Sequence, residues 1–115
     1  WTEQAGAVRQ ATKLGNQPKT LGTTATAASI AVDAAHVYWP NAASIDFAPI
    51  GGGVVSEQAL PCTAAAEVVT DGSFVYVACS DRIARFPSGG GGATTVVVDG
   101  SPHGLRVAGG ALFWD

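Results

Sequence analysis

Short apolar stretches separated by tight polar breaks recur along the chain at a regular interval. The stretch at 30–39 reads IAVDAAHVYW, two apolar runs around a polar turn. It returns as VVTDGSFVYV at 68–77 and as LRVAGGALFW at 105–114, so the copies begin 38 and then 37 residues apart (68 − 30 and 105 − 68). A fixed period of this size indicates a repeat architecture. We therefore expect one structural unit to recur along the whole chain.

Each unit is predicted to contain four short strands, because two further runs follow the paired apolar runs. These third and fourth runs lie at 6–11, 44–48 and 82–86, and at 19–23, 54–60 and 94–99, respectively. Pro49 and Pro87 follow two of the third runs, and proline suits a strand end because it has no N–H to donate. No segment has helical spacing of its apolar residues, so short turns should join the strands in antiparallel order. The more polar fourth run suits an outer strand.

Three of the paired apolar runs, at 30–32, 37–39 and 74–77, are apolar at every position. A sheet with one solvated face would instead alternate apolar and polar residues. Both faces of these sheets must therefore be covered, although the sequence offers no helices to cover them. Radial stacking of four-stranded sheets, the β-propeller, meets this requirement. A two-sheet sandwich is the alternative, but it does not explain the period.

The repeated motifs resemble those of β-propeller families. IAVDAAHVYW, SIDFAP and RIARFPSGG are similar to the NHL, YWTD and streptogramin-lyase-like propellers, especially to secreted bacterial repeat proteins with a GIAVD…VYW pattern. The resemblance implies an all-β fold, an incomplete β-propeller of about three four-stranded antiparallel blades whose first strands line the axis. The implied division is the last three strands of a blade at 1–25, blades at 26–62 and 63–100, and the first two strands of a blade at 101–115.

Composition and charge exclude several classes of protein. The chain is 47% hydrophobic and 13% charged, which suits a packed core and not a disordered segment. Its net charge is −3 and it has no basic patch, so nucleic acid is not an expected partner. No apolar run reaches the ~20 residues of a membrane-spanning helix, so no membrane span is expected.

The chain has no methionine, and Trp1 and Trp114 share the repeat phase of Trp39. We therefore expect a piece of a longer protein, cut within strands. Its first and last partial blades should each leave an apolar face uncovered, formed by Trp1, Val8 and Leu21 and by Leu105, Leu112 and Trp114. The expected partners are the remaining blades of the parent protein, or further copies of this chain that associate through these faces.

Asp33 and Asp71 follow the first strand of successive units. They could form a ring of carboxylates that holds a metal, but the third copy has Ala108 at this position. Aspartate before a tight turn ordinarily accepts backbone N–H groups, and this is the role we expect. Glu67, before the second copy of the first strand, and His36, at a strand start, are weaker candidates for chemistry.

His103 lies in the tripeptide PHG directly before the third copy of the first strand. In streptogramin-lyase-like propellers a PHG tripeptide leads into the inner strand, and some such histidines serve a metal-dependent active site. The resemblance therefore makes His103 a weak candidate for a catalytic or metal-binding role. The other copies lack it, and an eliminating lyase needs a base and several metal ligands, so a loop histidine is the other interpretation. We expect no cofactor. The run Gly89–Gly92 is expected to be a flexible turn, because it lacks the Lys-Ser/Thr of a phosphate-binding loop.

The two cysteines, Cys62 and Cys79, lie on either side of one predicted hairpin. With the turn at Gly72 and Ser73, residues opposite each other sum to about 145, so that Cys79 should face Ala66. A bridge then requires the chain before Ala66 to bend back. We leave open a disulfide, which would indicate an oxidising compartment, and a pair of buried free thiols.

The sequence favours a non-enzymatic binding or scaffold module of an extracytoplasmic or secreted bacterial protein, with an unknown ligand. The alternative is a fragment of a metal-dependent propeller enzyme, similar to a streptogramin lyase or a lactonase. Inner-strand histidines and carboxylates in further blades would favour the enzyme.

Overall fold

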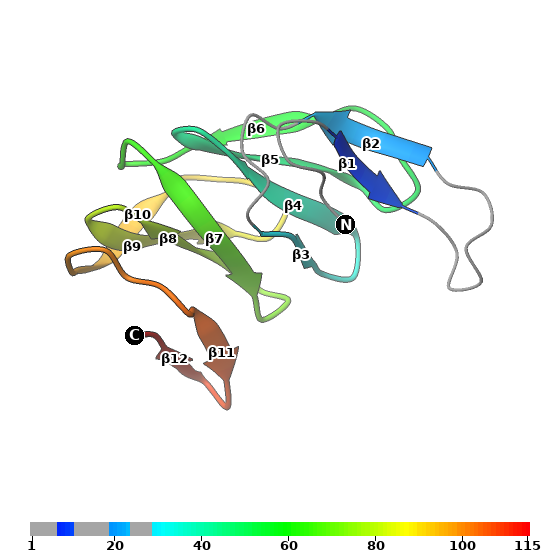
Figure 1. The fold of residues 1–115 in the computed structure, drawn as a ribbon. Helices are drawn as coiled ribbons and strands as arrows, with labels where there is room; N and C mark the ends of the chain where they lie inside the picture. Colours follow the sequence, from blue (N-terminus) through cyan, green and yellow to red (C-terminus); the bar gives the residue numbers. More distant parts are fainter. Residues whose placement is uncertain (1–6, 11–18, 24–28) are drawn as a thin grey trace.

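The computed structural model describes residues 7–10, 19–23 and 29–115 (Figure 1). The described residues form twelve strands and no helix, and every paired strand is antiparallel. The all-β class predicted from the sequence is therefore confirmed. The expected strand at Trp1 and the turn at 15–18 lie outside the described residues.

The strands form two pairs and two four-stranded sheets. The N-terminal pair contains β1 (Ala7–Gln10) and β2 (Lys19–Thr23). The first full sheet contains β3 (Ala31–Val32), β4 (His36–Asn41), β5 (Ser44–Pro49) and β6 (Ser56–Ala59). The second full sheet contains β7 (Ala65–Thr70), β8 (Phe74–Cys79), β9 (Arg82–Pro87) and β10 (Thr94–Val98). The C-terminal pair contains β11 (Arg106–Ala108) and β12 (Ala111–Phe113). In both full sheets the strands neighbour each other in chain order.

The three hairpins predicted from the repeated motif are confirmed. The strands β3 and β4, β7 and β8, and β11 and β12 pair antiparallel. Their registers are equivalent, with Ala31 opposite Tyr38, Val69 opposite Tyr76 and Arg106 opposite Phe113. The three hairpins therefore share one pattern of backbone pairing.

The register near Cys79 differs from the prediction. Cys79 lies opposite Ala65 and not Ala66, because a β-bulge interrupts the β7–β8 ladder between Ala65 and Glu67. A bulge places one extra residue in one strand and leaves it unpaired. Ala66 is that extra residue, and it brings the start of β7 one position closer to Cys79.

Both faces of the central strands are covered, as predicted from their unbroken apolar runs. In β4 the residues Val37, Tyr38, Trp39 and Pro40 are all buried. Successive side chains of a strand point to opposite faces of its sheet. Val37 and Trp39 accordingly pack against the N-terminal pair, whereas Tyr38 packs against the second full sheet. The first full sheet is thus the middle layer between two neighbours.

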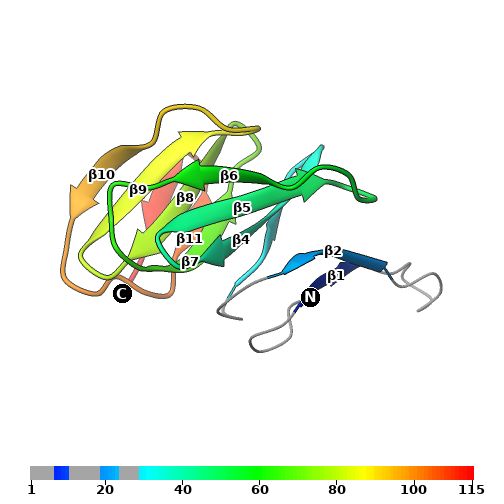
Figure 2. The ribbon, with the colours of Figure 1, turned by 90° about the horizontal axis from the view of Figure 1, so that it is seen from above.

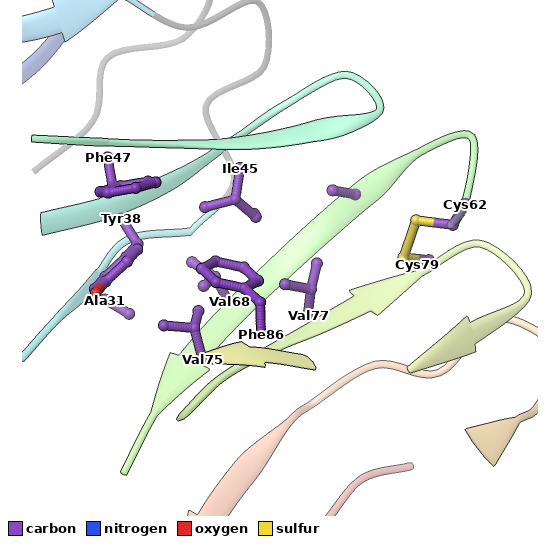
Figure 3. Close-up of a cluster of buried hydrophobic side chains, with 11 residues drawn as sticks. Ala31, Tyr38, Ile45, Phe47, Cys62, Val68, Val75, Val77, Cys79 and Phe86 are labelled. Atoms are coloured by element: carbon purple, nitrogen blue, oxygen red, sulfur yellow. A yellow bond between two sulfur atoms is a disulfide. The ribbon is translucent and has the colours of Figure 1, made fainter. Parts of the chain in front are cut away.

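Three apolar clusters fill the spaces between successive sheets. The largest lies between the two full sheets and includes Tyr38, Ile45, Phe47, Val68, Val75, Val77 and Phe86 (Figure 3). A second joins Val8 and Leu21 of the N-terminal pair to Trp39. The third joins Leu105 to Ala78 and Ile83. Figure 2 shows the full sheets side by side, with the N-terminal pair beyond the first. Each sheet thus contacts its neighbours in the chain.

The prediction that each partial blade leaves an apolar face uncovered is largely wrong for the described residues. Val8 and Leu21 are buried, because their side chains point toward the first full sheet and not away from it. Leu105 is also buried, against the second full sheet. Leu112 is partly buried against the same cluster. Trp114 is 36% exposed, as expected, and Phe113, which the prediction did not include, is 56% exposed.

Candidate functional site

Asp33 and Asp71 form the turns between the first two strands of their sheets. Asp33 Oδ1 accepts the N–H groups of Ala35 and His36, both at 2.8 Å. Asp71 Oδ1 accepts the N–H groups of Ser73 and Phe74, also at 2.8 Å. The N–H of Phe74, together with that of Ser73, lowers the pKa of Asp71. Both carboxylates therefore have the turn role expected from the sequence.

Asp33 also belongs to a hydrogen-bonded chain that crosses between the two full sheets. The hydroxyl of Tyr38 donates to Asp33 Oδ2 at 2.6 Å, and the Tyr38 oxygen accepts the N–H of Gly89 at 2.9 Å. Burial alone would raise the pKa of Asp33, but the hydrogen bonds from Tyr38 and the turn amides outweigh it and lower that pKa. Burial, and then the hydrogen bond to Asp33, raise the pKa of Tyr38 to about 12. The pair thus stays carboxylate and phenol over a wide pH range.

Gly89–Gly91 form a loop of the second full sheet that is hydrogen-bonded to the first full sheet. The sequence predicts only a flexible turn here. The N–H of Gly91 donates to Gln58 Oε1 of β6 at 2.9 Å, in addition to the bond from Gly89 to Tyr38. A Cβ on Gly90 would lie 3.1 Å from the Phe47 ring. All three glycines have positive φ, which side chains disfavour. The glycine run therefore lets the loop approach the first full sheet.

Glu67 bonds the C-terminal pair to the second full sheet. Its Oε2 and Oε1 accept the N–H groups of Gly104 and Leu105, each at 2.9 Å. Ser29, one repeat earlier, makes the equivalent link between the full sheets, since its Oγ accepts the N–H of Val68 at 3.1 Å. The same repeat position thus joins neighbouring sheets twice. Glu67 is therefore a structural acceptor whose two oxygens are both occupied by backbone donors.

The two histidines have different neighbours and do not share a site. His103 is exposed, its Nδ1 lies 3.1 Å from the carbonyl oxygen of Ser101, and its backbone pairs with that of Asp115. His36 packs edge-on against Phe47, and its Nδ1 lies 4.0 Å from Asp33 Oδ1. Within residues 7–10, 19–23 and 29–115, no three His, Cys, Asp or Glu side chains gather as metal ligands would. Among these residues His103 therefore belongs to no such group of three.

Cys62 and Cys79 form a disulfide, with their Cα atoms 6.2 Å apart (Figure 3). The chain bends at Pro61, Cys62 and Thr63, just before β7, and this bend provides the reversal that a bridge to Cys79 requires. The bridge is buried at the edge of the main apolar cluster. It closes the β7–β8 hairpin covalently.

A cleft of about 490 Å³ opens beside the turn between β4 and β5. Its lining consists of Asn41, Ala42, Ala43, Ser44, Glu57, Ala59 and Leu60. Beside it, Asp46 is buried, opposite Glu57 in the β5–β6 register. Asn41 Nδ2 donates to Asp46 Oδ2 at 2.9 Å, and Ser44 Oγ lies 3.5 Å from Oδ1. The cleft therefore combines amide and hydroxyl groups with an exposed carboxylate. Sequence reasoning missed it, because its residues belong to a turn and an outer strand without a recognisable motif.

No family model matches this sequence, and no curated protein is significantly similar to it.

Proposed function

We propose that the chain is a non-enzymatic binding or scaffold module. One observation carries this proposal: the carboxylates that the sequence offers for chemistry are engaged in holding the backbone. Asp33, Asp71 and Glu67 each accept two backbone N–H groups. A general base or metal ligand needs lone pairs free for substrate or metal. Asp33 and Asp71 instead hold the turns of their own sheets, and Glu67 joins the second full sheet to the C-terminal pair.

The proposed architecture is an incomplete β-propeller with blades at 26–62 and 63–100 and partial blades at 1–25 and 101–115. The equivalent links made by Ser29 and Glu67 support it, because they give successive sheets the same relation to each other. The turns after β4 and β8 add a second repeated link, in which the carbonyls of Ala42 and Ser80 accept N–H groups from the chain entering the next unit. A constant relation between four-stranded sheets is what radial stacking requires.

The proposed location is extracytoplasmic, in a secreted bacterial protein. The Cys62–Cys79 disulfide supports an oxidising compartment, where such bonds persist. No helix of the described residues has the length and apolar character to cross a bilayer. The bacterial source rests on the sequence resemblance alone.

The proposed ligand surface is the cleft beside the β4–β5 turn. Glu57 is an exposed carboxylate, with Asp46 opposite it on the next strand, so a ligand carrying positive charge or several hydrogen-bond donors suits this cleft. Nuclear magnetic resonance titration with the tripeptide Gly-Lys-Gly tests this. We expect amide shifts at Asn41, Ser44 and Glu57 that Glu57→Gln abolishes. Asp81→Asn is the matched control, because it removes the same charge from a turn of the second full sheet. Equal shifts in both variants would contradict a specific cleft.

The competing hypothesis is a fragment of a metal-dependent propeller enzyme with His103 at its site. Calorimetric titration with Mg²⁺, Mn²⁺ and Zn²⁺ separates the two. If the chain is a binding module, we expect no saturable heat of metal binding that is lost in the His103→Ala variant. Binding of one metal ion per chain that depends on His103 would favour the enzyme.

The partners we propose are the remaining blades of a parent protein or further copies of this chain.

A further inference from the structure

The cleft beside the β4–β5 turn is lined by the first full sheet but is held in place by the second. One of its walls is the β4–β5 turn itself, in which Ala42 has a φ of 57°, a left-handed conformation that alanine rarely adopts. The carbonyl oxygen of Ala42 accepts the N–H of Ala65, the first residue of β7, at 2.8 Å. This wall is therefore fixed by a hydrogen bond from the second full sheet.

The second wall of the cleft consists of Ala59, at the end of β6, and Leu60, which follows it; we call it the Leu60 wall. Two residues beyond Leu60, Cys62 is buried although its neighbours in the chain are exposed, and it is bonded to Cys79. Cys79 lies opposite Ala65 in the β7–β8 ladder. Both walls are therefore held at the same point of the second full sheet, one by a hydrogen bond and one through a disulfide.

We infer that the Cys62–Cys79 disulfide fixes the Leu60 wall, so that reduction by a dithiol releases this wall and weakens binding in the cleft. The inference rests on the cleft being the ligand surface proposed above. Leu60 is only partly buried, against the apolar cluster that contains both cysteines. The backbone bonds to the second full sheet lie further along the chain, at Ala64 and Ala65. A wall that is already fixed loses no freedom when a ligand binds, whereas a mobile wall must be ordered at a cost in affinity.

The reduction is a thiol–disulfide exchange with a dithiol. One thiolate of the reductant attacks the sulfur of Cys62, the more exposed of the two cysteines, and the thiolate of Cys79 leaves. The second thiolate then attacks the reductant's own sulfur in the mixed disulfide and releases Cys62. Two electrons and two protons pass to the protein, which gains two thiols, while the reductant becomes a disulfide.

The test compares the whole chain before and after reduction by dithiothreitol. Methyl relaxation in nuclear magnetic resonance measures the freedom of Leu60, and titration with Gly-Lys-Gly measures the affinity of the cleft. We expect reduction to lower the order parameter of the Leu60 methyl groups and to weaken peptide binding about threefold to tenfold. The methyl groups of Ile45, fully buried in β5 of the same sheet, should keep their order. Equal loss of order at Ile45 would show a general loosening of the fold and would overturn the inference.

Two glycine variants keep the disulfide and so separate its local effect from a loss of folding. Pro61 lies between Leu60 and Cys62, whereas Thr63 lies between Cys62 and β7, and both are exposed. Pro61→Gly lets the Leu60 wall move although the bond is intact, because glycine lacks the fixed φ of proline. It should reproduce part of the loss of order and of affinity. Thr63→Gly is the matched control on the far side of the bond and should leave both unchanged.

The order of Leu60 decides the inference independently of the ligand. Unchanged order after reduction, or equal losses in the two glycine variants, would overturn it, and so would a released wall with undiminished affinity. If Gly-Lys-Gly binds to no form of the protein but reduction frees Leu60, the disulfide does hold the wall and the ligand proposed for the cleft is wrong. If reduction unfolds the chain, the two glycine variants decide.

Discussion

Trp39 is the residue at which the N-terminal pair and the first full sheet are most tightly joined. Its side chain is fully buried beside Val8 and Leu21. Gly22 lies directly on the indole, since a Cβ at Gly22 would come within 2.5 Å of the Trp39 ring. Any side chain at Gly22 would have to displace the ring or the strand. The sequence marks this tryptophan by its repeat phase, but the glycine facing it has no such mark.

We predict that Trp39→Ala lowers the free energy of unfolding by about 3–5 kcal/mol, because it leaves a cavity between two sheets. Trp114→Ala is the matched control at the same repeat phase, and it should cost only about 1 kcal/mol, since Trp114 is 36% exposed. Urea unfolding followed by circular dichroism measures both. Equal losses would mean that Trp39 is no better packed than Trp114.

Tyr38 provides a prediction about alkaline pH. Its folded-state pKa of about 12 lies above the ordinary value of 10.0, so the folded state holds the phenol proton more tightly than the unfolded chain. The resulting stability is complete below pH 10 and is lost as the pH rises toward 12. Ultraviolet titration of the phenolate should show an ionisation near pH 12 that Tyr38→Phe removes and Tyr76→Phe retains. Retention of that step in Tyr38→Phe would assign it to another group.

At the scale of the element, the hairpins could be placed from sequence because three signals coincide in them. Apolar runs surround a turn, the pattern recurs, and in two of the three hairpins the turn contains an aspartate, Asp33 or Asp71. The bulge at Ala66 could not be predicted, because one extra residue changes the register without changing the apolar pattern. The link from Tyr38 to Gly89 spans 51 residues, and only the repeated spacing of aspartate and tyrosine hints at it.

The two hydrogen bonds to Glu67 should help to hold the C-terminal pair on the second full sheet. Glu67→Ala leaves the N–H groups of Gly104 and Leu105 without their acceptor, at a cost of about 1–3 kcal/mol. We expect amide exchange in β11 to become about tenfold to a hundredfold faster, while exchange in β8 stays unchanged. Glu57→Ala, at an exposed carboxylate of β6, is the control and should leave both rates as they are. Unchanged exchange in the Glu67 variant would show that apolar packing alone holds β11.

The Cys62–Cys79 disulfide should make the stability of the second full sheet depend on the redox conditions. Its two cysteines are 17 residues apart, and closing a loop of about this length stabilises a fold by about 3 kcal/mol. Reducing agent should therefore lower the melting temperature of the natural sequence but not that of the Cys62→Ser/Cys79→Ser variant. Thiol titration of the denatured, unreduced protein should find no free thiol. Two free thiols would contradict the bond.

At the scale of the whole molecule, stability should follow the order of the sheets. Each sheet packs only on its neighbours in the described structure, as in repeat proteins, where stability is a sum of nearest-neighbour terms. The strands β4, β5, β8 and β9 have neighbours on both sides, whereas β11 and β12 pack on one side. Native-state hydrogen exchange should find global protection in the former and local opening in the latter. Uniform protection across all twelve strands would contradict this gradient.

The closed β7–β8 hairpin also determines what a protease would reveal. Its turn at Asp71, Gly72 and Ser73 is exposed, so it is the part of the hairpin most open to cutting. A cut there breaks the chain between Cys62 and Cys79, yet the bond between them keeps both pieces in one molecule. Nicked protein would migrate as intact material until a reductant separates it into two fragments. The disulfide also keeps the two sides of this turn together when the turn is lengthened. The turn is therefore a suitable position for inserting a foreign peptide.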